Sequence, residues 1–215
     1  MASDKMYAVI TADVIDSCRI EGFRRKRDAK LRPLSRLHVR QKLVLSDYAV
    51  TAWDEFQAVL YSPQAIPHVV LDLRRNFYPM HLWIAIGIGK VSEPRKKPVN
   101  QFAGGEAFER ARLAADRLKA DRAGKDPTLT GFVSGNAVFD LIANTIYRLH
   151  DTLLQDVSAK QWETILAQIS TGNQELAANK LGVNVSTVSR NLRRAHHWQM
   201  EETCQAVEAI IRSYF

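Results

Sequence analysis

The chain has 215 residues, 46% hydrophobic and 25% charged, which fits two small globular domains and excludes a disordered chain. Its 30 Lys and Arg against 23 Asp and Glu give a net charge of +7, which favours polyanionic partners only weakly. The two cysteines, Cys18 and Cys204, exclude a disulfide framework and a cysteine-based zinc site. Because we find no signal-peptide pattern and no apolar run of membrane-spanning length, we expect a cytoplasmic protein without a membrane partner.

The first 135 residues alternate between patterns typical of strands and of helices. Short apolar runs predict strands, and apolar residues at helical spacing predict helices. In chain order we expect a strand at 7–14, a helix at 28–43, a hairpin at 48–61 that turns at Asp54–Glu55, a helix at 64–77, a strand at 81–91, a helix at 106–122 and a strand at 128–134. This order predicts an α+β fold with helices over one face of a mainly antiparallel sheet. Gly87 and Gly89 would allow backbone or a ligand to approach closely.

The strand patterns end at Gly135. Apolar residues from Val138 to Leu153 mark a long amphipathic helix, and a further helix is expected at 159–170. We therefore predict an α/β domain at 1–135 and a helical domain at 136–215. If the first of these helices is a connector, the boundary falls just after it instead.

The segment 173–195 has the pattern of a helix-turn-helix. Ala178 lies four residues before Gly182, and its small side chain would let two helices cross closely. Gly182 permits the left-handed backbone that ends the first helix, and Asn184 is a suitable N-cap for the second. The helix at 159–170 would complete a three-helix core.

The second helix of this motif buries one face and leaves the other polar and basic. Such groups contact phosphates and base edges when a helix lies in the major groove of DNA. We therefore predict duplex DNA as a partner and the following DNA-binding residues: Ser186, Thr187, Ser189, Arg190, Asn191, Arg193 and Arg194. An ordinary helical hairpin with a basic surface is the alternative.

Basic residues gather in three places along the chain. These are Arg24–Arg27, Arg95–Lys97, and the group Arg190, Arg193 and Arg194. A run of like charges is usually a solvated surface. Only the third group lies inside a motif that explains it, so the sequence assigns a function to that group alone.

The C-terminal segment leaves two interpretations open. Its apolar residues between Trp198 and Tyr214 either form an interface with a second copy or fold back on the same chain. Regulators that contain a helix-turn-helix commonly read paired half-sites as symmetric dimers. We therefore expect a homodimer.

Four short motifs of the first domain occur in a familiar order. They are ADV at 12–14, WDEFQ at 53–57, IGIG at 86–89 and GGEAFERARLA at 104–114. This order resembles the palm domain of class III nucleotide cyclases and of GGDEF diguanylate cyclases, a ferredoxin-like fold. The chain is still more similar to the SatD family of bacterial proteins, which joins such a domain to a C-terminal helix-turn-helix. That resemblance covers nearly the whole chain, and the helix-turn-helix also resembles region four of sigma factors.

The resemblance implies a metal and nucleotide site in the palm-like domain. Asp13 ends the first strand and Asp54 lies in the hairpin, and two carboxylates on neighbouring strands can hold a divalent cation against phosphates. Asp13 and Asp54 match the palm metal ligands, so the expected cofactor is Mg or Mn with a nucleotide. Val14 matches a position whose carbonyl also reaches the metal. Arg112 lies near the position of a cyclase arginine that stabilises the transition state.

Two departures from the palm pattern bear on activity. Trp53 stands where GGDEF proteins have glycine, and Phe108 stands about where cyclases place a catalytic asparagine. Both argue against cyclase turnover. Without a metal, Asp13 would cap a turn and Asp54 would be an ordinary turn aspartate.

Three functions are consistent with these patterns. The first is a DNA-binding regulator whose palm-like domain senses a nucleotide or metal, or mediates oligomerisation. The second is a cyclase-like phosphoryl-transfer enzyme that its helical domain directs to DNA. The third is an interaction module in which neither site is active.

Overall fold

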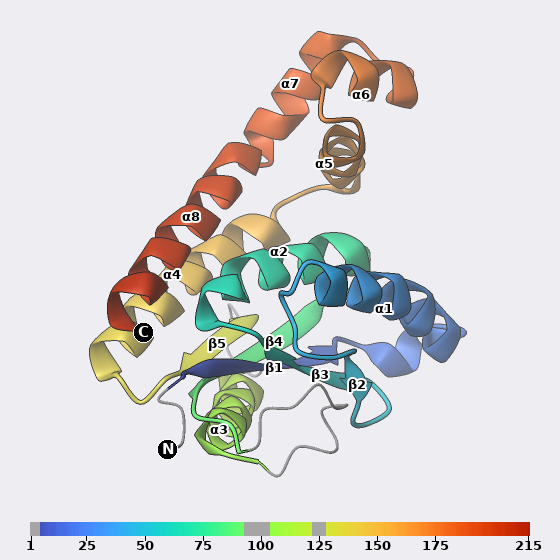
Figure 1. Cartoon of the computed structure of the whole chain (residues 1–215). Coiled ribbons are helices and arrows are strands. Elements are labelled where there is room, and N and C mark those ends of the chain that lie inside the picture. The colour runs from blue at the N-terminus through green and yellow to red at the C-terminus, as the bar shows by residue number, and fades with distance from the viewer. Residues whose placement is uncertain (1–4, 93–103, 122–127) are drawn as a thin grey trace.

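The computed structural model describes residues 5–92, 104–121 and 128–215 and confirms a mixed α+β fold (Figure 1). In the described residues, five strands form one sheet in the order β2-β3-β1-β4-β5. Every neighbouring pair is antiparallel except β4 and β5, which are parallel. The strands are β1 Tyr7–Val14, β2 Ala49–Val50, β3 Glu55–Leu60, β4 Leu82–Gly89 and β5 Thr130–Val133.

Eight α-helices accompany the described strands. They are α1 Phe23–Arg40, α2 Ile66–Phe77, α3 Glu106–Asp121, α4 Ala137–Gln155, α5 Ala159–Thr171, α6 Gln174–Leu181, α7 Val185–Arg194 and α8 His197–Tyr214. Short 3₁₀ turns at Ser17–Arg19 and Pro63–Ala65 precede α1 and α2. The predicted hairpin is present, but Glu55 already belongs to β3 and pairs with Asp13, so the turn is made by 51–54.

Helices cover both faces of the sheet, and this corrects the prediction of helices on one face only. On β1, Ala8 and Ile10 pack in the core beneath α1 and α2, while Tyr7 and Val9 pack with Ala107 of α3 on the opposite face. Figure 1 shows α3 beneath the sheet and α1 and α2 above it. The apolar run of β1 lacks polar alternation because both faces of the strand are covered.

Helix α4 closes the edge of the sheet beside β5. Side chains on one face of α4 accept hydrogen bonds from backbone N–H groups of the edge segment: Asp140 from Ser134, Asn144 from Phe132 and Asp151 from Leu129. Asp151 also forms a buried ion pair with Arg74 of α2, with an N–O distance of 3.2 Å. An exposed edge strand would otherwise leave these N–H groups open to pairing with another chain.

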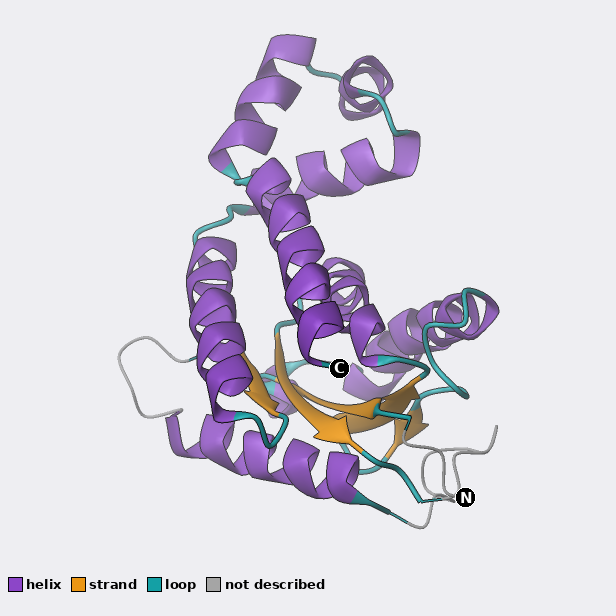
Figure 2. Ribbon diagram, turned by 60° about the vertical axis from the view of Figure 1, so that its left-hand side comes forward, coloured by secondary structure: helices purple, strands orange, loops and turns teal. Residues whose placement is uncertain are grey.

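Helix α8 folds back on its own chain. Val207 and Ile211 join the core above the sheet, and the Cys204 thiol donates a hydrogen bond to the carbonyl of Pro67 at 3.6 Å. The described strands thus lie within the predicted α/β domain at 1–135. Helix α4 and the end of α8, which belong to the predicted helical domain at 136–215, nevertheless pack against the sheet. Helices α5 to α7 lie at the far end of α8, away from the sheet (Figure 2). Trp198 and Tyr214 keep exposed surface, and the homodimer stays a prediction.

Candidate nucleic-acid interface and ligand groove

Helices α5, α6 and α7 pack around a small apolar core. Trp162 and Ile165 of α5 meet Ala178 of α6 and Val188 and Leu192 of α7. The arrangement follows from the local sequence, because each helix has a defined start and end. Ser158 and Gln161 form a capping box at α5, the Asn173 side chain caps α6, and Gly182 ends α6 with a φ of 65°. Asn184 holds the N-cap position of α7 without a side-chain capping bond.

The outer face of α7 carries most of the predicted DNA contacts. Ser186, Arg190, Arg193 and Arg194 are exposed, and Thr187 and Ser189 are half-buried at the sides of this face. Val188 and Leu192 are buried on the opposite face. Within the described part of the chain, the three arginines make no hydrogen bond or ion pair. Their donors therefore point to solvent, as a recognition helix requires.

Asn191 has a different environment from the other predicted contacts. Its side chain is half-buried, and its Nδ2 donates a hydrogen bond to Oγ1 of Thr164 in α5 at 3.0 Å. On a helix, residues three and four apart are neighbours, so Asn191 lies between the buried Val188 and Ala195 on one side and Arg194 on the other. The amide thus holds α7 against α5, a role that the sequence pattern did not indicate.

Asp13 lies near the end of β1 and Asp54 in the adjacent hairpin turn, and the two have different surroundings. The backbone N–H of Val14 donates to the carbonyl of Asp54 at 3.1 Å. Side chains alternate along a strand, and the residue directly across from Asp13 is Glu55. Asp13 and Glu55 both face α3, where they line a small pocket with Lys119.

The Asp54 carboxylate instead accepts a hydrogen bond from the Ser17 hydroxyl at 2.8 Å. In the described ranges, no group of three or more His, Cys, Asp or Glu is arranged to hold a metal ion. Because Asp13 faces α3 and Asp54 is held by Ser17, the two carboxylates fit a shared cation poorly.

The other positions that the palm pattern singles out have surroundings of their own. Arg112 is exposed on α3. Phe108 is partly buried in the apolar cluster between α3 and the sheet. Trp53 is half exposed, and the guanidinium of Arg24 stacks on its ring at 4.2 Å from the centroid. The Trp53 side chain thus occupies space that a glycine would leave open.

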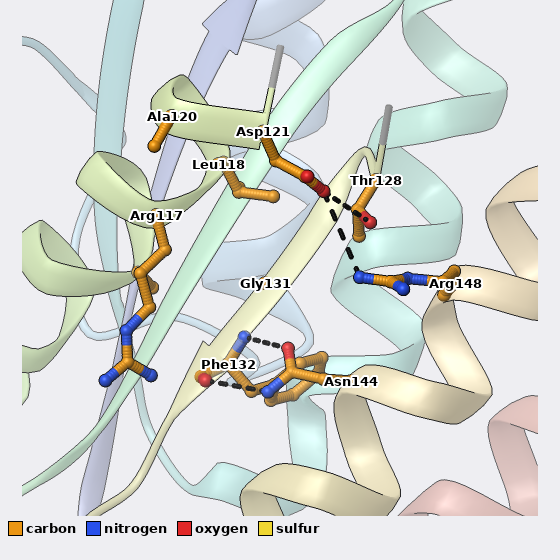
Figure 3. A pocket seen from close by; sticks show the side chains of 10 residues that line it. Arg117, Leu118, Ala120, Asp121, Thr128, Gly131, Phe132, Asn144 and Arg148 are labelled. Atoms are coloured by element: carbon orange, nitrogen blue, oxygen red, sulfur yellow. Dashed lines mark hydrogen bonds and ion pairs between the residues drawn. The ribbon is translucent and has the colours of Figure 1, made fainter. Parts of the chain in front are cut away.

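A groove runs between α3 and α4 above β5 (Figure 3). It has a volume of about 440 Å³, and Gly131 and Phe132 form its floor. Arg117 lies on the α3 side and Arg148 on the α4 side, where Arg148 faces Asp121 at 3.9 Å. A second hollow of about 550 Å³ shares Arg117, Asn144 and Arg148 with the first.

The groove combines two guanidinium groups with a largely apolar lining that includes Leu118 and Phe132. Asn144 has both amide atoms bonded to the backbone of Phe132, so it is part of the frame and not a flexible contact. Two arginines on opposite walls suit an anionic ligand. Sequence reasoning missed the groove because Arg117 and Arg148 lie on separate helices and belong to no motif.

No family model matches the chain, and no curated protein matches it in sequence. Among the described residues, none of the helices combines the length and the apolar character needed to cross a bilayer.

Proposed function

We propose that the chain is a DNA-binding regulatory protein that contacts duplex DNA through α7. The observation that supports this most strongly is the exposed row of Arg190, Arg193 and Arg194 on a helix fixed by a buried core. Surface arginines that stabilise a fold usually have acidic partners, whereas these guanidinium groups face solvent. The close crossing at Ala178 and the turn at Gly182 fix how α7 is presented relative to α6, which also supports this proposal.

Binding of a fluorescent duplex across a salt series tests this proposal. Each phosphate contact contributes about 0.9 to the slope of log affinity against log salt. The double variant Arg190→Ala/Arg194→Ala should reduce that slope by about 2. The control is Arg19→Ala/Arg212→Ala, which removes two exposed arginines held only in surface ion pairs. Equal binding by the α7 variant and the wild type would show that α7 is not the DNA contact.

The groove between α3 and α4 supports the second half of the proposal, that the palm-like domain senses a nucleotide. Its volume falls within the range of small-molecule sites, and Arg117 and Arg148 could hold phosphate groups. Isothermal titration with ATP and GTP, with and without magnesium, measures this directly. Arg117→Ala/Arg148→Ala should abolish the heat of binding. If the wild type binds neither nucleotide, the domain serves oligomerisation or structure instead.

A cyclase-like enzyme is the alternative function. It needs a metal site, and the surroundings of Asp13 and Asp54 do not favour it. Incubation with ATP or GTP and manganese, followed by chromatography for cyclic products and pyrophosphate, separates sensing from turnover.

A further inference from the structure

The positive charge of this chain is concentrated on α1. Helix α1 contains eight Lys and Arg and a single acidic residue, Asp28. Its net charge of +7 equals the formal net charge of the whole chain, so the rest of the protein is neutral overall. The segment 159–195, which contains the helix-turn-helix, has five basic and two acidic residues and thus carries only +3.

Two of the basic side chains of α1 belong to the fold. Arg27 is buried and donates to the carbonyl of Trp53 at 2.5 Å and to Asp28. The Lys30 ammonium donates to the carbonyls of Asn76 and Tyr78 at 2.8 and 2.9 Å. These two groups anchor α1 to the hairpin turn and to the end of α2.

Four arginines have the opposite orientation. Arg25, Arg32, Arg36 and Arg40 are exposed, and at about 100° per residue they lie within an arc of roughly 80°. That arc is opposite the buried face, which contains Phe23, Leu31 and Leu34. The row is about 22 Å long at 1.5 Å per residue. Figure 1 shows α1 at the side of the molecule, next to α2.

The row does not stabilise the fold. Arg32 pairs with Asp28 at 3.1 Å, while Arg25, Arg36 and Arg40 have no hydrogen bond or ion pair among the residues that the structure describes. Arg32, Arg36 and Arg40 follow one another at intervals of four, and like charges at that spacing repel along a helix. Packing and pairing within the chain therefore leave the row unexplained.

We propose that this arginine row binds the phosphate backbone of duplex DNA without reading bases. It would be a second DNA-contact surface, in addition to α7. The choice of DNA as the polyanion rests on the proposed function. A row of this length can meet several phosphates, because each strand carries one per roughly 3.4 Å of helix axis. A membrane surface fits less well, since an interfacial helix needs large apolar side chains beside its charged face and the leucines of α1 point inward.

Salt-dependent binding to a random-sequence duplex tests the row. The variant with Arg25, Arg32, Arg36 and Arg40 all changed to Gln should lower the slope of log affinity against log salt by three to four, at about 0.9 per phosphate. Its circular dichroism and melting should match the wild type, since the row has a single surface ion pair. The double variant Arg36→Gln/Arg40→Gln and the control Arg19→Gln/Arg212→Gln each remove two positive charges. Comparing their DNA binding therefore separates the position of the arginines from loss of charge alone.

The outcomes separate this inference from the proposed function. If the α1 variant binds like the wild type while Arg190→Ala/Arg194→Ala loses binding, the row is not a DNA surface and the helix-turn-helix proposal stands. If only the α1 variant loses binding, the row is confirmed and the proposed role of α7 is wrong. If the α1 variant keeps DNA binding but loses binding to phosphatidylcholine vesicles that contain phosphatidylserine, the inference is overturned in favour of a membrane.

Discussion

Gly87 of β4 and Ala107 of α3 meet backbone to backbone. A Cβ atom added to Gly87 would lie 2.1 Å from the carbonyl oxygen of Ala107 and 2.2 Å from the backbone nitrogen of Ala111. At Gly89 the same addition would lie 2.8 Å from the side chain of Glu106. The glycines of the IGIG motif therefore bring α3 onto the sheet, and this contact explains the motif without a ligand.

Gly87→Ala should destabilise the protein strongly. The atoms in its way are backbone atoms of α3, so the helix must move as a whole, and we expect a loss on the order of 3 kcal/mol or more. Gly172→Ala is the control: its φ of 68° strains a side chain, yet nothing lies within 4 Å. It should cost about 1 kcal/mol. Urea unfolding measures both, and equal losses would contradict the close packing of α3.

Ala178→Leu tests the crossing of α6 and α7. Ala178 is 2% exposed in the core of the three helices, so a larger side chain must push the helices apart. We expect a loss of about 1–3 kcal/mol in the free energy of unfolding, together with weaker DNA binding. The control is Ala209→Leu at an exposed position of α8. A variant that melts and binds DNA like the wild type would remove the basis for the helix-turn-helix assignment.

Local signals made the helix-turn-helix and most strands predictable. Caps, a left-handed glycine and apolar spacing act within a few residues, and each is visible in the sequence around Gly182. The strand at 7–14 was likewise evident from its apolar run. These features needed no knowledge of the tertiary structure.

Relations between distant elements were not predictable in the same way. Asp140, Asn144 and Asp151 seal a sheet edge, but on the sequence they are only polar residues of an amphipathic helix. The fold-back of α8 was one of two open interpretations, since an apolar stripe does not reveal what covers it. The exposed arginine row of α1 also needed the structure, which shows that Arg27 and Lys30 turn inward while four arginines turn outward.

His197 should make stability depend on pH. Burial, and to a smaller extent the charge of Arg75, lower the pKa of His197 below its ordinary value of 6.5. Below pH 6.5 the unfolded state therefore binds more protons than the folded state, so this contribution to stability is complete above pH 6.5 and declines as the pH falls. His197→Gln should lose less stability than the wild type between neutral pH and about pH 5 in urea titrations. A decline of the same size in both proteins would show that His197 does not titrate on unfolding.

The two cysteines should differ sharply in reactivity. Burial raises the pKa of Cys204 to about 12, with a smaller contribution from the charge of Glu201, so the thiolate is scarce at neutral pH. Cys18 is exposed. In the native protein one thiol should react with Ellman's reagent, and in denaturant both should react. Cys18→Ser should abolish the native reaction, and a rapid second reaction in folded protein would contradict the packing of α8 on α2.

The last prediction concerns Asp13 and Asp54, the metal ligands that the palm resemblance implies. If they share a manganese ion, manganese must raise the melting temperature of the wild type, because a ligand that binds only the folded state stabilises it. Asp13→Asn/Asp54→Asn should abolish that rise.

In chelator the double variant should be at least as stable as the wild type, since Asp13 no longer repels Glu55 directly across the strands. The structure also supplies the opposite expectation, because Asp54 accepts a hydrogen bond from Ser17. A manganese-independent loss of about 1 kcal/mol in the double variant would mark Asp54 as a turn residue and the metal prediction as wrong.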